Sequence, residues 1–151
     1  MKMISACLCG VNCKYNGGNN FEPRLKELMD SEECILICPE TSGNLPVPRD
    51  ACEIKGGTGK DVIAGYARVI DTKGRDLTDY FLAGAYKTLL EAIKAGVDYA
   101  ILKSRSPSCG TDKIYDGTFS SAIISGDGVT SALLRMHGIT VINDQDYLLK
   151  E

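Results

Sequence analysis

Seven cysteines and one histidine carry most of the chemistry that this sequence of 151 residues offers. A single imidazole excludes zinc sites built from several histidines and disfavours a catalytic triad. His137 stands before Gly138 at the end of a predicted helix, where we expect its ring to lie near the last helix carbonyls. The cysteines are odd in number and we expect no signal peptide before them, so a secreted disulfide framework is not the expected use of these residues. In a cytoplasmic protein, which we expect here, clustered thiols indicate metal or redox chemistry.

Three of the cysteines come at the ends of predicted buried strands. Cys7 ends the first strand, Cys38 ends the second, and Cys109 lies in the loop that leaves the third. Ligand sites in open parallel sheets form outside the carboxyl ends of the strands, so we expect these thiols to converge. Three thiolates without a histidine suit soft metals, iron–sulfur clusters above all. Cys13 is a candidate fourth ligand, which a structural zinc ion would need.

Polar residues accompany these cysteines in their loops. Glu40 follows Cys38 by two residues and brings a carboxylate close to the expected centre. Near Cys109, two cations (Lys103 and Arg105) lower the energetic cost of a thiolate, and two serines (Ser106 and Ser108) supply hydroxyl groups. Of the other cysteines, Cys34 lies within a strand and is interpreted as core, whereas Cys9 and Cys52 receive no role.

The elements that must position these residues alternate between apolar runs and stretches with helical periodicity. This order favours an α/β fold with a largely parallel sheet flanked by helices, in a Rossmann-like or flavodoxin-like three-layer arrangement. We expect one domain over residues 1–151. The predicted strands cover residues 3–7, 34–37, 66–70, 99–102 and 140–142, and the predicted helices cover residues 24–29, 77–95, 129–136 and 144–149.

The longest predicted helix has the clearest pattern. Asp76 can cap it and Gly96 can end it, while one apolar face repeats every four residues. The face consists of Leu77, Phe81, Ala85, Leu89 and Ile93. We expect a small antiparallel excursion within residues 52–75, with a hairpin turn at residues 56–59, and irregular loops over residues 38–51 and 104–125.

Composition limits the classes of function. Hydrophobic residues make up 44% of the chain and charged residues 25%, as in ordinary globular proteins. The apolar runs are too short for a bilayer, so we expect no membrane partner. The net charge of −3 disfavours a protein held to nucleic acid mainly by charge, although it is compatible with one small nucleotide or base.

The loops together resemble the thiouracil desulfidase (TudS) domain family, long catalogued as a domain of unknown function. The resemblance begins in residues 5–17, around Cys7 and Cys13, and continues in Cys38-Pro39-Glu40, residues 43–49 and Glu53-Ile54. It extends through Leu102-Lys103, residues 106–110, residues 114–119 and residues 126–130. The matches occur in order over nearly the whole chain. This sequence departs from the usual family residues at Cys9, Asn16, Asn44 and Cys52.

The resemblance implies a compact α/β domain with a [4Fe-4S] cluster, which aerobic preparation can destroy. The family pattern places its three ligands at Cys7, Cys38 and Cys109, with one iron left open. It further implies removal of sulfur from thiolated uracil or a thiolated nucleoside without redox change, with release of sulfide. Thiolated RNA is the less favoured substrate. For the attack of water, Glu40 is the candidate base and Ser106 a candidate proton relay, although Glu40 could instead only pin its loop.

Two other classes of function remain open from the sequence. One is a zinc-stabilised module that binds a nucleotide through residues 126–128 at a helix N-terminus. The other is a sulfur carrier in which Cys109 becomes a persulfide. Anaerobic purification distinguishes them, because iron, zinc and a metal-free reactive thiol give different metal contents.

Overall fold

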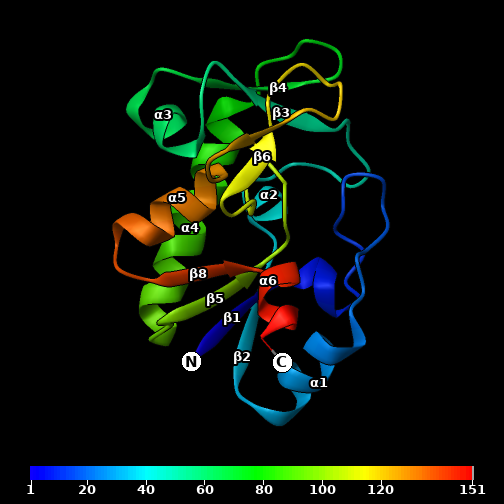
Figure 1. Cartoon of the computed structure of the whole chain (residues 1–151), viewed down its shortest axis with the longest axis vertical. Coiled ribbons are helices and arrows are strands. Elements are labelled where there is room, and N and C mark those ends of the chain that lie inside the picture. The colour runs from blue at the N-terminus through cyan, green and yellow to red at the C-terminus, as the bar shows by residue number, and fades with distance from the viewer. Residues whose placement is uncertain (151) are drawn as a thin grey trace.

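The computed structural model describes residues 1–150, and a four-stranded parallel sheet lies at their centre (Figure 1). The sheet order is β2 (Cys34–Ile37), β1 (Lys2–Ser5), β5 (Tyr99–Leu102) and β8 (Thr140–Asn143). Ile4 in β1 pairs with Leu36 on one side and with Ile101 on the other. The chain moves from β1 to one side of the sheet and later returns to the other, so a topological switch point lies between β1 and β5.

Helices cover both faces of this sheet and bury two apolar clusters (Figure 1). The larger cluster lies under α4 (Thr78–Ala95) and α5 (Val129–Met136), and the smaller one under α1 (Pro23–Ser31) and α6 (Asp144–Leu149). Neighbouring strand residues divide between the two: Met3 enters the larger cluster and Ile4 the smaller. The predicted three-layer α/β architecture is confirmed.

The long helix α4 ends before Gly96 as its sequence predicts, but its N-cap is Leu77, one residue after the predicted cap Asp76. Asp76 Oδ1 accepts the backbone N–H of Thr78 at 2.9 Å, and Gly96 adopts a left-handed φ of 71° after the last turn. The prediction for its buried face is wrong at Ile93, which is 59% exposed. Four-residue steps drift around a helix of 3.6 residues per turn, so Ala92 takes the buried position instead.

Between the sheet strands the chain forms more regular structure than its sequence predicts. The antiparallel pair β3 (Cys52–Lys55) and β4 (Arg68–Asp71) is present, but the expected hairpin turn at residues 56–59 is wrong. There the chain enters α3 (Gly59–Ala64), because the Thr58 and Asp61 side chains form a capping box.

The two loops expected to be irregular also contain short elements. Residues 38–51 include α2 (Pro39–Ser42), which Pro39 can start because a first-turn residue needs no donor. Residues 104–125 include the antiparallel pair β6 (Lys113–Tyr115) and β7 (Ile123–Ser125). The first strand ends at Ser5, and Cys7 lies in the 3₁₀ helix η1 (Ala6–Cys9) that follows. Among residues 1–150, no helix has the length and apolarity needed to span a membrane.

Helix α2 packs closely on α4 through a glycine. A Cβ atom at Gly84, in the middle of α4, would overlap the carbonyl oxygen of Pro39 at the start of α2. The Thr88 hydroxyl donates to the Gly84 carbonyl at 2.8 Å, so this turn of α4 is held in place. The position of α2, and with it that of Cys38 and Glu40, therefore depends on the missing side chain.

Replacing Gly84 by Ala should destabilise the protein, although alanine has the higher helix propensity. We expect a loss of about 1–3 kcal/mol in the free energy of unfolding, because the added methyl group pushes α2 away. Urea unfolding measures this loss. The control is Ala83→Gly at the exposed neighbouring position, which should lose only about 1 kcal/mol through helix propensity. Stability equal to or above that of the unchanged protein in Gly84→Ala would contradict the close packing.

Candidate active site

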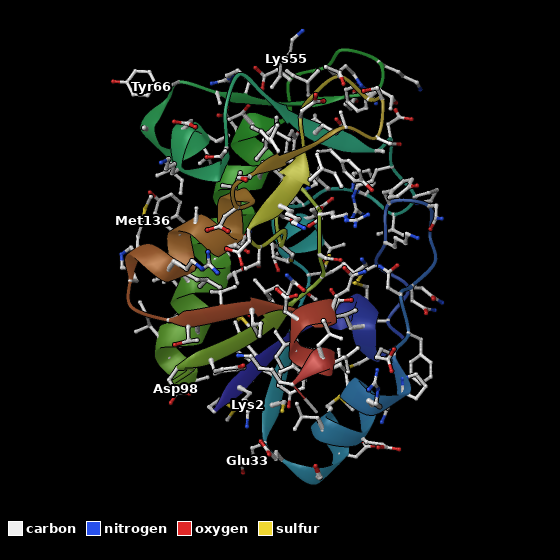
Figure 2. All side chains as sticks on the ribbon, viewed as in Figure 1. Lys2, Glu33, Lys55, Tyr66, Asp98 and Met136 are labelled. Atoms are coloured by element: carbon white, nitrogen blue, oxygen red, sulfur yellow. The ribbon has the colours of Figure 1, made fainter. Side chains whose placement is uncertain are left out.

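The carboxyl ends of β1, β2 and β5 open into a cavity of about 620 Å³. Lys2, Glu33 and Asp98, which lie at or just before the starts of these strands, mark the opposite edge of the sheet (Figure 2). The cavity therefore lies at the switch point, where parallel sheets form their ligand sites. Its volume is typical of sites for small molecules.

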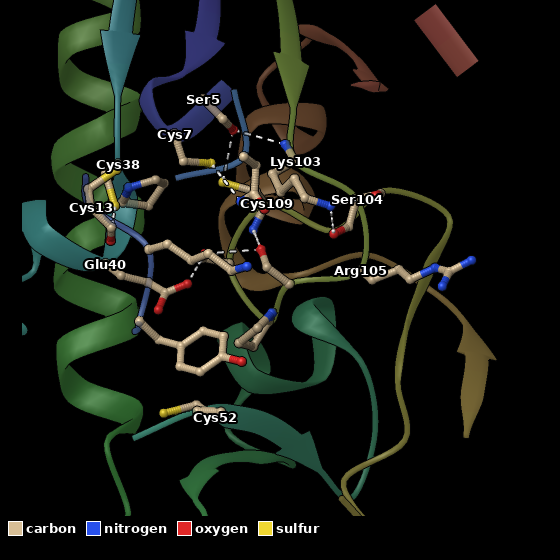
Figure 3. A pocket seen from close by; sticks show the side chains of 18 of the residues that line it. Ser5, Cys7, Cys13, Cys38, Glu40, Cys52, Lys103, Ser104, Arg105 and Cys109 are labelled. Atoms are coloured by element: carbon tan, nitrogen blue, oxygen red, sulfur yellow. Dashed lines mark hydrogen bonds between the residues drawn. The ribbon is translucent and has the colours of Figure 1, made fainter. Parts of the chain in front are cut away.

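Five cysteines line this cavity, and four of them come from the three segments that follow β1, β2 and β5 (Figure 3). Cys7 lies on η1, Cys38 stands directly before α2, and Cys109 lies in the loop after β5. Cys13 also faces the cavity, and its carbonyl oxygen lies 3.8 Å from the Cys38 sulfur. The structure thus brings together the three cysteines that the strand ends selected, with the fourth beside them.

Two polar side chains donate hydrogen bonds to the cysteine sulfurs. The Ser5 hydroxyl donates to Cys109 Sγ at 3.4 Å and accepts the backbone N–H of Lys103 at 2.9 Å (Figure 3). The Asn20 side-chain amide donates to Cys7 Sγ at 3.4 Å. Such bonds stabilise negative charge on sulfur, and in iron–sulfur proteins they tune the cluster. Sequence reasoning missed Asn20, which lies in a loop without any periodic signal.

The thiols differ in acidity. A hydrogen bond from Cys13 lowers the pKa of Cys38 to about 6, and the same neighbour lowers the pKa of Cys7. Burial raises the pKa of Cys109 to about 12. A thiol that stays protonated at neutral pH is a poor nucleophile, which disfavours Cys109 as a persulfide carrier.

The Glu40 carboxylate is held from both sides. Arg49 Nε donates to Oε1 at 3.1 Å, and the Ser108 hydroxyl donates to Oε2 at 2.7 Å. The Arg49 side chain is 6% exposed and also donates to the carbonyl oxygens of Cys13 (2.9 Å) and Pro46 (3.1 Å). Arg49 therefore balances the charge of Glu40 and fixes its orientation beside the cavity. Its role was missed from the sequence, although it belongs to a segment of the family resemblance.

The two serines near Cys109 have different partners. Ser106 Oγ accepts the backbone N–H of Cys109 at 2.7 Å and lies 3.4 Å from Ser108 Oγ. It is therefore Ser108, and not Ser106, that contacts Glu40. Both residues line the cavity, so the hydroxyls and the carboxylate form one chain from Ser106 through Ser108 to Glu40.

The two cations expected near the thiols, Lys103 and Arg105, differ in the direction of their side chains. Lys103 lies close enough for its positive charge to lower the pKa of Cys7, and its ammonium group donates to Ser104 Oγ at 3.0 Å. Arg105 points away from the cysteines (Figure 3) and adopts a left-handed φ of 69°. The expectation that Arg105 supports the Cys109 thiolate is therefore wrong, because the loop turns its side chain outward.

The loop of Cys109 is fixed by the N-terminus of α5. Backbone N–H groups of Val129 and Thr130 donate to the carbonyl oxygens of Pro107 and Ser108, at 2.8 and 3.0 Å. The N–H of Gly128 donates to Gly110 O at 2.8 Å. These donors are the ones that an anion would need at a helix N-terminus. The alternative nucleotide site at residues 126–128 is therefore disfavoured, because the chain itself occupies these N–H groups.

The remaining cysteines lie apart from the three central thiols. Cys9 is buried against α1, with its sulfur 3.9 Å from Leu25 O, and half-buried Cys34 packs against the smaller apolar cluster. Cys52 is buried and lines the cavity from β3, beyond Glu40 (Figure 3). Burial raises the pKa of its thiol to about 12. His137 ends α5, and its Nδ1 lies 3.0 Å from Leu133 O, as expected from its sequence position.

The donor set of the cavity fits an iron–sulfur cluster better than one metal ion. Within residues 1–150, no three Cys, His, Asp or Glu side chains lie close enough to hold a single ion. A cluster does not require its cysteines to converge on one ion, because each cysteine binds a different iron. Soft thiols around one cavity, with Ser5 and Asn20 bonded to their sulfurs, are suitable ligands for it.

Comparison with known proteins gives consistent matches. A profile of the 2-thiouracil desulfurase family matches residues 3–146. The Bacillus subtilis (strain 168) protein YbbK, described as uncharacterized, is 42% identical over 146 residues, which cover 97% of each chain. A solved structure described as the [4Fe-4S]-dependent thiouracil desulfidase TudS (DUF523Vcz) is 35% identical, with a TM-score of 0.83 over 95% of this chain and 90% of that one. The chain belongs to the 2-thiouracil desulfurase family.

Proposed function

We propose that this protein is a desulfidase that replaces the sulfur of a thiolated uracil, or of its nucleoside, by oxygen from water. The carbon–sulfur bond breaks, a carbon–oxygen bond forms, and sulfide leaves, so no external oxidant or reductant is needed. The observation that carries the proposal is that Cys7, Cys38 and Cys109 line one cavity together with Glu40. Membership of the family and the similarity to a [4Fe-4S]-dependent thiouracil desulfidase support it.

Cys7, Cys38 and Cys109 would hold the [4Fe-4S] cluster, which supplies a Lewis-acidic iron for the thiocarbonyl sulfur. Buried Cys109 lies in the loop that follows β5, and the N-terminus of α5 holds this loop in place. Cys13 adjoins Cys38, and its pKa is raised by hydrogen bonds to Cys38 and Cys7. A neutral Cys13 thiol can donate to sulfur without adding negative charge.

Glu40 is the proposed proton acceptor for the attacking water. Its Oε2 already accepts the Ser108 hydroxyl, so a water next to Ser108 or Ser106 can lose its proton along the hydroxyl chain to the carboxylate. Arg49 occupies Oε1 and keeps the carboxylate oriented while it takes up the proton. Ser106 has the further task of positioning the Cys109 backbone.

Replacing Cys7, Cys38 or Cys109 by Ser should abolish the visible absorbance of the cluster in anaerobically prepared protein. A hard hydroxyl is a poor substitute for a soft thiolate. Cys34→Ser is the matched control and should keep the absorbance, because this residue is remote from the cavity lining. Loss of the cluster in Cys34→Ser, together with its retention in Cys7→Ser, would reject the ligand set.

Glu40→Gln should keep the cluster but lower the rate of sulfide release per bound iron by about 10²- to 10⁴-fold, the usual contribution of a general base. The amide preserves size and most polarity, but it cannot take up the proton. If Glu40 only pinned its loop, iron content would fall and the normalised rate would stay the same, which would remove Glu40 from the mechanism.

Ser108→Ala should also lower the rate of sulfide release per bound iron, because its hydroxyl donates to Glu40. The control is Ser104→Ala, whose hydroxyl accepts from Lys103, and it should leave this rate unchanged.

A further inference from the structure

The tip of the β6–β7 hairpin forms part of the cavity wall. Tyr115, Phe119 and Ser121 from this hairpin line the cavity that also contains the cysteines. Within residues 1–150, β6 and β7 pair with each other and not with the four-stranded sheet. The position of the tip therefore depends on contacts other than sheet hydrogen bonds.

The tip holds its aromatic residue in an unfavourable backbone conformation. Phe119 has a φ of 56° and Ser121 a φ of 65°, both in the left-handed region. This region is uncommon for residues other than glycine, and a bulky side chain there is an outlier. Such strain persists only where the surroundings enforce it, and it occurs preferentially at ligand-binding sites.

One carboxylate enforces this conformation from the neighbouring strand. Glu53 on β3 accepts two backbone N–H groups of the tip with the same oxygen, from Gly117 at 3.0 Å and from Phe119 at 3.2 Å. Gly117 lies against β3, where an added Cβ atom would come within 2.6 Å of Ile54 O. Backbone contacts thus fix the tip on β3. The Phe119 side chain takes no part in these hydrogen bonds.

The Phe119 ring does not enter either apolar cluster. Phe119 is 39% exposed and lines the cavity. A second exposed aromatic residue, Tyr15, borders the same cavity from the loop after η1, and the backbone N–H of Arg49 donates to its carbonyl oxygen at 2.7 Å. The Lys14 ammonium lies over the Tyr15 ring, 5.8 Å from its centroid, so of these two rings it is Phe119 that stays available beside the polar, cysteine-lined floor, as in sites for planar heterocycles.

We propose that Phe119 binds the pyrimidine ring of the substrate by stacking, and that Glu53 is the positioning residue that holds it there. This inference rests on the proposed function and adds a specificity determinant to it. Stacking between an aromatic side chain and a base tolerates different substituents, because every base has a π-face. It selects planar aromatic thiocarbonyl compounds over small thioamides such as thiourea, which offer no ring.

The test measures binding of uracil, the ring without its sulfur, to anaerobic cluster-loaded protein by calorimetry. Phe119→Ala should weaken the affinity by about 5- to 150-fold, the range measured for base–aromatic stacking. It should raise KM for thiouracil by a similar factor while kcat changes little. Phe119→Tyr should restore both values, whereas Phe119→Leu should not. The matched control is Ile123→Ala, at a position on the same hairpin that is 40% exposed and outside the cavity lining.

Glu53 is tested by the contrast between two variants. Glu53→Ala removes the acceptor and should raise KM as Phe119→Ala does, with little change in iron content. Glu53→Gln should behave like the unchanged protein, because its amide oxygen can accept the same two N–H groups. A merely structural role would instead lower the melting temperature, iron content and kcat together.

Two results would overturn the stacking role. One is an affinity for uracil that is the same in Phe119→Ala and Ile123→Ala, and the other is full restoration by Phe119→Leu, which would indicate only an apolar wall. A protein that binds uracil through Phe119 but releases no sulfide from thiouracil would refute the proposed function and still support the stacking role.

Discussion

All four strands of the main sheet run in the same direction, so the chain leaves each of them at the same edge. Because β1 has β2 on one side and β5 on the other, three exits lie next to one another at the switch point. The segments that follow carry Cys7, Cys38 and Cys109. A site assembled from residues separated by up to 102 positions in sequence thus requires no special folding event beyond the pairing of these strands.

Strand direction brings the segments together, but other contacts set their final geometry. The N-terminus of α5 binds the carbonyl oxygens of the Cys109 loop, and the close approach of α2 to α4 places Glu40. Arg49 then connects the two sides through Glu40 and Cys13 O. Removing one partner of such a buried ion pair leaves an uncompensated charge, which typically costs about 3–5 kcal/mol. The polar network therefore contributes to the arrangement of the cavity as well as to its chemistry.

The sequence predicted the parts of the fold that depend on apolar pattern. Residues 34–37 and 99–102 are uninterrupted apolar runs, and parallel strands buried on both faces require such runs. The ends of these predicted strands in turn predicted that Cys38 and Cys109 lie at the edge of the sheet. The short helices α2 and α3 were missed, because a capping box and a glycine contact stabilise them rather than a periodic face.

The partners within the site were less predictable than its location. Arg49 and Glu40 lie nine residues apart across a turn, and no local pattern pairs them. Ser106 and Ser108 are two residues apart in an irregular loop, where side-chain directions follow no period, so only the structure assigns the contact with Glu40 to Ser108. The outward direction of the Arg105 side chain was not predicted for the same reason, because this residue lies in the same irregular loop.

The central claim is that water replaces sulfur at this cavity when the cysteines hold a cluster. The most direct test mixes anaerobically prepared protein with thiouracil in water labelled with oxygen-18, and measures iron content, sulfide and product mass together. The account predicts about four irons per chain, with equal amounts of sulfide and of uracil carrying a single heavy oxygen. Iron-loaded protein that yields no uracil, or uracil without the heavy oxygen, would contradict it.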